Sequence, residues 1–124
     1  MDKFASRAGE KLQFALDKFE IIVHDLIAAD FGSSTGGFVD CLLQNGIKKV
    51  YSVDTSYGEL AWKLRNDPKV IVMERTNAMH VVLPEKTDFI SIDTGWTKQK
   101  MVLPNAINNL KPNGRIITLI KPHY

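Results

Sequence analysis

The sequence lacks cysteine pairs, long apolar runs and a strong net charge. Its single cysteine, Cys41, cannot form a disulfide within the chain, and no histidine or cysteine cluster surrounds it, so neither a disulfide framework nor a metal site is expected. No apolar run approaches the ~18 residues that a membrane-spanning helix needs. The first residues lead into a charged amphipathic segment instead of a signal peptide, which predicts a reducing, cytoplasmic setting.

The charge and size of the chain indicate an ordinary globular domain. The formal net charge of +2 is too small to indicate nucleic-acid binding by itself. Solvated side chains are the simpler interpretation of most basic residues, although seven of them would form a basic face if the fold gathered them: Arg7, Lys11, Lys63, Arg65, Lys98, Lys100 and Lys121. The 124 residues, with no internal repeat or linker, predict one domain that buries about two thirds of its surface.

A glycine-rich stretch at residues 28–38 connects an apolar run to a predicted helix. Gly32, Gly36 and Gly37 would let the backbone bend and lie against a ligand. The spacing is not that of the dinucleotide fingerprint, and no Lys-Ser or Lys-Thr pair follows as in a P-loop. With Asp30 in front of the glycines, the stretch suits S-adenosylmethionine, a cation without phosphates. The alternative is a strand-turn-helix connection whose glycines serve packing alone.

Helix and strand patterns alternate along the chain. Strands are predicted at residues 26–31, 49–54, 70–74, 88–93 and 115–120. Helices are predicted from an N-cap at Ser6 to residue 19, and at residues 38–45, 58–66 and 98–110, with a turn at 111–114. The strands read as almost continuous apolar runs, which favours an α/β fold with a parallel sheet, in the order 3-2-1-4-5, covered by helices on both faces.

Polar residues follow the predicted strands. Asp54 lies 24 positions after Asp30, close to the offset at which such folds place a ribose-binding carboxylate, although a helix cap is the alternative. Asn77 could contact an adenine edge or cap the next turn. Together with Asp93 and Lys121, these residues are expected along one rim of the sheet.

Lys121 ends an apolar strand and is therefore expected to be partly desolvated. Burial and a nearby cation such as Lys11 would favour its neutral form, whereas Asp93 would oppose it. A lysine in this state could accept a proton from a hydroxyl group.

Five segments of the chain closely resemble the hemolysin A (TlyA) branch of the FtsJ-like ribose methyltransferases. They are residues 6–12, 30–43, 57–65, 74–78 and 119–122. The resemblance extends over nearly the whole chain, so residues 1–124 are expected to form a single methyltransferase domain with a Rossmann-like fold. It implies an S-adenosylmethionine-dependent enzyme that methylates ribose 2′-hydroxyls of ribosomal RNA, with ribosomal RNA or a ribosomal subunit as its partner.

The resemblance also assigns residues to roles. The Lys-Asp-Lys-Glu catalytic set of the family matches Lys11, Asp93 and Lys121, with Lys121 as the base for the 2′-hydroxyl. Asp54 corresponds to the ribose contact, Asn77 to the adenine contact, and Asp93 to the methyl-bearing end of the cofactor. The remaining cofactor contacts fall in the glycine motif: Asp30, Gly32, Ser33, Ser34, Gly36, Gly37 and Phe38.

The chain departs from the family pattern in three ways. No S4 RNA-binding domain precedes Met1, the chain stops before the closing glutamate of the catalytic set, and residues 94–100 differ from the usual string. The sheet is therefore expected to be truncated after the fifth strand. If the protein ends there, the open edge of that strand predicts either pairing with a partner chain, for example in a homo-oligomer, or modest stability.

The sequence leaves three alternatives to a methyltransferase. A module that binds S-adenosylmethionine without catalysis, and acts by binding ribosomal RNA or a partner, differs least from the main hypothesis. A Rossmann-type oxidoreductase is disfavoured by the glycine spacing. A pore-forming hemolysin is disfavoured because no membrane-seeking segment is visible.

Overall fold

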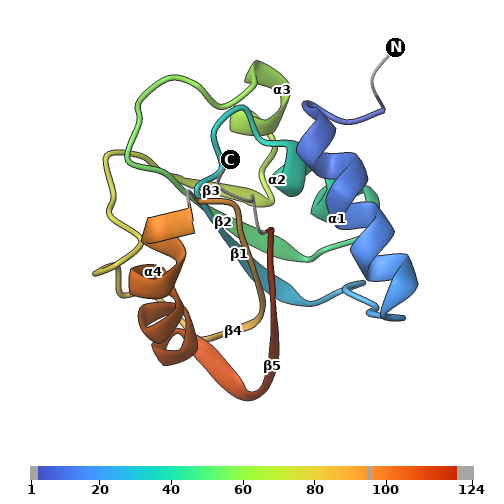
Figure 1. The fold of residues 1–124 in the computed structure, drawn as a ribbon. Helices are drawn as coiled ribbons and strands as arrows, with labels where there is room; N and C mark the ends of the chain where they lie inside the picture. The colour runs from blue at the N-terminus through green and yellow to red at the C-terminus, as the bar shows by residue number, and fades with distance from the viewer. Residues whose placement is uncertain (1–2, 95, 120–124) are drawn as a thin grey trace.

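One parallel sheet forms the centre of the molecule. The computed structural model describes residues 3–94 and 96–119 (Figure 1). The sheet is built from β1 (Ile27–Phe31), β2 (Lys49–Val53), β3 (Val70–Met73), β4 (Thr87–Ile92) and β5 (Leu110–Thr118). The strand order is β3-β2-β1-β4-β5 and every described pairing is parallel, as predicted from the sequence.

Helices lie on both faces of the sheet, as Figure 1 shows. They are α1 (Arg7–Lys18), α2 (Gly37–Gln44), α3 (Trp62–Arg65) and α4 (Trp96–Asn108). α1 and α2 pack on one face and α4 on the other. Of the helices in the described parts of the chain, none has the length and apolar character needed to cross a bilayer.

Alternate residues of the central strands enter two separate cores. On β1, Ala28 packs under α1 and α2, whereas Ala29 packs under α4. Both side chains are fully buried, because successive residues of a strand point to opposite faces of the sheet. This two-sided burial explains the continuous apolar runs of the sequence. Cys41 lies in the first core, as expected, where burial above all raises the pKa of its thiol to about 12.

Ser6 occupies the N-cap position of α1, but its side chain makes no capping hydrogen bond. The start of the helix is held by a contact with α2 instead, since the Ala5 N–H donates to the Asp40 carboxylate over 2.8 Å. The predicted position of the cap is confirmed, and the predicted side-chain contact is wrong.

The helix predicted at residues 58–66 is shorter in the structure, where α3 covers only the four residues Trp62–Arg65. Gly58 has a positive φ of 79°, and its N–H donates to the Glu74 carboxylate. The Ala61 N–H donates to the Thr35 carbonyl over 3.1 Å. These backbone groups bind neighbouring loops, so the preceding segment stays outside the helix.

The turn predicted at residues 111–114 lies inside β5. Leu110 pairs with Thr87 and Arg115 pairs with Phe89, so the residues between them form an irregularity in the ladder. The Lys-Pro-Asn-Gly sequence therefore marks a bulge, and the strand resumes where it was predicted. α4 also begins at Trp96, two residues before the predicted start.

Candidate functional site

A cavity of about 400 Å³ lies at the carboxyl ends of β1 to β4. It is open at the point where β1 pairs with β2 on one side and β4 on the other, which is where ligands bind in sheets of this order. Its volume lies in the range of small-molecule sites. Its wall consists of residues from the four loops after these strands and from α4: Gly32, Ser34, Val53, Asp54, Thr55, Ser56, Glu59, Thr76, Asn77, Ala78, Met79, Asp93, Thr94, Lys98 and Val102.

Gly32 brings the backbone against the cavity directly after β1. Its φ is +89°, and a Cβ built on it would lie 2.6 Å from the Asp93 carbonyl oxygen. Its N–H donates to the Val53 carbonyl over 2.8 Å. The glycine is therefore required both by the conformation of the turn and by the close approach of the chain that leaves β4.

Asp54 is fixed on the cavity wall by backbone donors. Its Oδ1 accepts the Ser56 N–H over 3.2 Å, and its Oδ2 accepts the Ser34 N–H. The N-cap of the next helix, α3, is Ala61. Asp54 is thus no helix cap, and its half-buried carboxylate joins the glycine-rich loop to the loop after β2.

Asn77 makes the turn contact that was one of its two interpretations, and it also lies at the cavity. Its Oδ1 accepts the Met79 N–H over 2.9 Å, so it stabilises the next turn. The same side chain is exposed and lines the cavity. A contact with an adenine edge stays a prediction.

Asp93 lines the cavity at the end of β4, and Lys98 lines it from the beginning of α4. The Asp93 N–H donates to the Phe31 carbonyl over 3.1 Å, which ties the end of β4 to β1. The sequence placed Lys98 only among the surface basic residues. Lys98 lies in the first turn of α4, because the helix begins at Trp96, soon after the end of β4. A prediction of this earlier helix start would have placed Lys98 near the strand end.

Asp30 is buried within β1 and does not line the cavity. Its side chain is 1% exposed, Oδ1 accepts the Ser91 hydroxyl over 2.8 Å, and Oδ2 has no hydrogen-bond partner in the part of the chain that the structure describes. Burial raises the pKa of the Asp30 carboxyl to about 7, against the hydrogen bond from Ser91, and the charges of Asp93 and Asp54 raise it further. Burial therefore favours the protonated form of this carboxyl.

The rest of the glycine motif contributes to packing. The buried Ser33 donates its hydroxyl to the Asp30 carbonyl over 3.2 Å. Leu60 and Leu64 occupy the space that a Cβ on Gly36 would need. Gly37 lies against α1 and its N-cap residue, and Phe38 is part of the core. None of these four residues lines the cavity.

The two predicted catalytic lysines differ in what the structure says of them. Lys11 is exposed on α1 and does not line the cavity. Lys121 lies outside the described residues. The structure thus brings together Gly32, Ser34, Asp54, Asn77 and Asp93 from the predicted set.

The model of one protein family, the FtsJ-like methyltransferases, matches residues 4–123. The chain is 44% identical over 126 residues to YqxC of Bacillus subtilis, which is named as a candidate rRNA methyltransferase. It is 39% identical over 125 residues to TlyA of Mycobacterium tuberculosis, named as a 16S/23S rRNA (cytidine-2′-O)-methyltransferase. These alignments cover 98% of this chain, and 45% and 46% of the two relatives.

A solved structure of a candidate hemolysin from Streptococcus thermophilus is similar over the same region. It is 38% identical to the chain, with a TM-score of 0.92, and the match covers 98% of this chain and 46% of that one. The chain therefore spans about half the length of the relatives it matches.

Proposed function

The chain belongs to the FtsJ-like methyltransferase family, and we propose that it serves the S-adenosylmethionine-dependent methylation of ribose 2′-hydroxyls in ribosomal RNA. The observation that carries the proposal is the cavity at the strand ends, where Gly32, Asp54 and Asp93 meet. The name of the Mycobacterium tuberculosis relative supports ribosomal RNA as the substrate.

The cavity suits an adenosyl sulfonium in shape and charge. Gly32 leaves room for a ligand against the backbone, and the carboxylates of Asp54 and Asp93 favour a cation. In the proposed arrangement Asp54 accepts hydrogen bonds from the ribose hydroxyls and Asn77 contacts the adenine edge. Asp93 lies near the methyl-bearing end. S-adenosylmethionine, when bound, supplies a methyl group activated by a positively charged sulfur.

The chain's own residues would orient and deprotonate the acceptor. Lys121 takes the proton of the ribose 2′-hydroxyl, while Asp93 and Lys11 hold the lysine and the hydroxyl in line. Orientation of this kind contributes about 7–11 kcal/mol in favourable cases. These roles rest on the family resemblance and on the position of Asp93 at the cavity.

Methyl transfer from tritiated S-adenosylmethionine tests the proposal. The full protein is incubated with ribosomal RNA and with intact ribosomal subunits, and alkali-resistant dinucleotides report 2′-O-methylation. We expect labelled product from the natural protein and none from Lys121→Ala, with the cofactor dissociation constant of that variant within severalfold of the natural value. Cofactor binding without transfer by the natural protein would favour the inactive binding module, and unchanged turnover in Lys121→Ala would refute its role as base.

A further inference from the structure

The segment at residues 55–61 forms one wall of the cavity and is not helical. Thr55, Ser56 and Glu59 contribute to the cavity wall. Leu60, from the same segment, packs against Gly36 of the glycine-rich loop. The segment therefore connects the end of β2 with the loop that follows β1.

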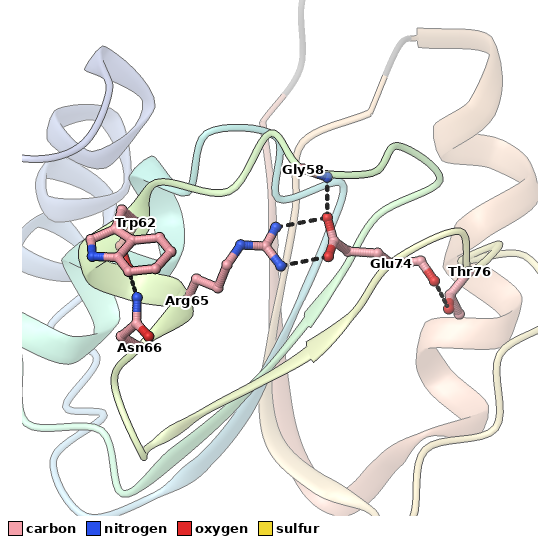
Figure 2. A network of polar contacts seen from close by, with 6 residues as sticks. All are labelled: Gly58, Trp62, Arg65, Asn66, Glu74 and Thr76. Carbon is pink, nitrogen blue, oxygen red and sulfur yellow. Dashed lines mark hydrogen bonds and ion pairs between the residues drawn. The ribbon is translucent and has the colours of Figure 1, made fainter.

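Contacts from the end of β3 hold this segment in place. The Arg75 N–H donates to the Ser56 carbonyl over 3.1 Å. Figure 2 shows the Glu74 carboxylate between the Gly58 N–H and both terminal nitrogens of Arg65. The two Arg65 nitrogens donate to the carboxylate oxygens over 2.7 and 2.8 Å. The position of the wall is thus fixed by contacts within the chain, and a wall held in this way costs little entropy when a ligand binds.

Glu59 and Asp54 reach the same side of the cavity through Ser34. The Ser34 hydroxyl donates to Glu59 Oε2 over 3.4 Å, and the Ser34 N–H donates to Asp54 Oδ2. Both oxygens of Asp54 already accept a backbone N–H. A ribose diol offers two hydroxyl donors, so two neighbouring carboxylates match it better than one that is partly occupied.

We propose that Glu59 is a second ribose-binding residue, which accepts a hydrogen bond from one hydroxyl of the adenosyl ribose beside Asp54. The inference rests on the proposed function, because it takes an adenosyl group as the ligand of the cavity. It adds a residue to the cofactor site that the sequence did not single out.

Calorimetric titration with S-adenosylhomocysteine and with its 2′,3′-dideoxy analogue tests the inference. S-adenosylhomocysteine has no sulfonium charge, so a loss of affinity in Glu59→Ala does not reflect attraction between the carboxylate and a sulfonium. We expect Glu59→Ala to weaken binding of S-adenosylhomocysteine about 10-fold, the low end for a hydrogen bond to a charged group. Glu59→Gln retains an acceptor oxygen and should lose less. Glu10→Ala, at an exposed position of α1, is the matched control and should bind normally.

The dideoxy analogue separates the ribose contact from other effects. It should bind the natural protein and Glu59→Ala with equal affinity, because it lacks the hydroxyls. Equal affinity of the two proteins for S-adenosylhomocysteine would overturn the role of Glu59 and leave the proposed function standing. The role of Glu59 would also be overturned if Glu59→Ala lost as much affinity for the dideoxy analogue as for S-adenosylhomocysteine, because the analogue has no ribose hydroxyls. If the natural protein failed to bind S-adenosylhomocysteine at all, the proposed function would be overturned, and this inference with it.

Discussion

Asp54 is the residue whose contacts define the cofactor wall most directly. Its carboxylate accepts N–H groups from Ser34 and Ser56, so its loss would remove a ligand contact and loosen two loops at once. We expect Asp54→Ala to weaken the binding of S-adenosylmethionine by about 10-fold or more, because the variant loses a hydrogen bond to a charged group. Isothermal titration calorimetry measures the change. An unaltered dissociation constant would count against the ribose contact.

Gly32 offers a test of the close approach between the strand ends. An alanine there would have a strained φ of +89° and a Cβ 2.6 Å from the Asp93 carbonyl oxygen. We expect backbone strain alone in Gly32→Ala to lower the free energy of unfolding by roughly 1–3 kcal/mol. The close contact between the new Cβ and the Asp93 carbonyl oxygen should lower it further. Urea denaturation measures both.

Gly58→Ala is the matched control for this experiment. Gly58 has a φ of +79°, but nothing lies within 4 Å of a Cβ built on it. It therefore shares the strain of Gly32 without the crowding. If the two variants were equally stable, the close approach at Gly32 would have no energetic consequence.

Asp30 predicts a pH dependence of stability. Because its pKa rises from 3.8 in the unfolded chain to about 7 in the folded protein, the folded state binds the extra proton. This contribution is fully present below the unfolded value and is lost as the pH rises through about 7.

We therefore expect the free energy of unfolding to fall as the pH rises from 3.8 to about 7, between the unfolded and folded pKa values of Asp30, and Asp30→Asn to remove most of that slope. Asparagine keeps an oxygen that accepts the Ser91 hydroxyl and carries no charge to desolvate. Urea titrations at several pH values measure the slope. A natural protein and variant with parallel pH profiles would contradict the protonated state of Asp30.

At the scale of the element, the short helix α3 depends on an ion pair with the end of β3. Arg65 contacts Glu74 through two nitrogens, and this hydrogen bonding holds the pKa of the Glu74 carboxyl at about 2. Arg65→Ala should lower the urea midpoint of unfolding. Arg65→Lys should lower it less, because lysine keeps the positive charge but cannot donate through two nitrogens of a planar guanidinium group. Lys69→Ala, at an exposed position nearby, is the control. A midpoint in Arg65→Ala equal to that of the control would contradict this role.

The elements themselves were largely predictable from the sequence. The strands follow continuous apolar runs. α2 ends at Gln44, directly before the predicted Asn45-Gly46 terminus, where Asn45 is the C-cap and Gly46 provides the positive φ. The helix at 58–66 and the turn at 111–114 could not be judged from local preference. In both cases the backbone contacts a partner that is distant in the sequence. The Gly58 N–H donates to the Glu74 carboxylate, and the residues on both sides of 111–114 pair with β4.

The candidate site was predictable where a residue follows directly from a strand end, as Asp54 and Asp93 do. Asp30 was predicted with them, but its side chain is buried within the sheet, where it accepts a hydrogen bond from Ser91, and it does not line the cavity. Glu59 was missed because it reaches the cavity only through the non-helical course of its segment. The roles of Lys11 and Lys121 and the pairing of the β5 edge with a partner chain stay predictions.

At the scale of the whole molecule, the strand order brings the separate parts of the site together. β1 is placed between β2 and β4, so the loops after these strands converge although they are distant in the sequence. The order was predictable because parallel strands joined by helices adopt few arrangements. The cavity therefore follows from the topology, and its chemistry from the polar residues at the strand ends.

A crystal structure of the protein with S-adenosylhomocysteine tests the central claim most directly. The account predicts the adenosyl group in the cavity at the strand ends, with the ribose at Asp54, the adenine at Asn77 and the sulfur beside Asp93. Density for the ligand at any other surface, with this cavity empty, would contradict it.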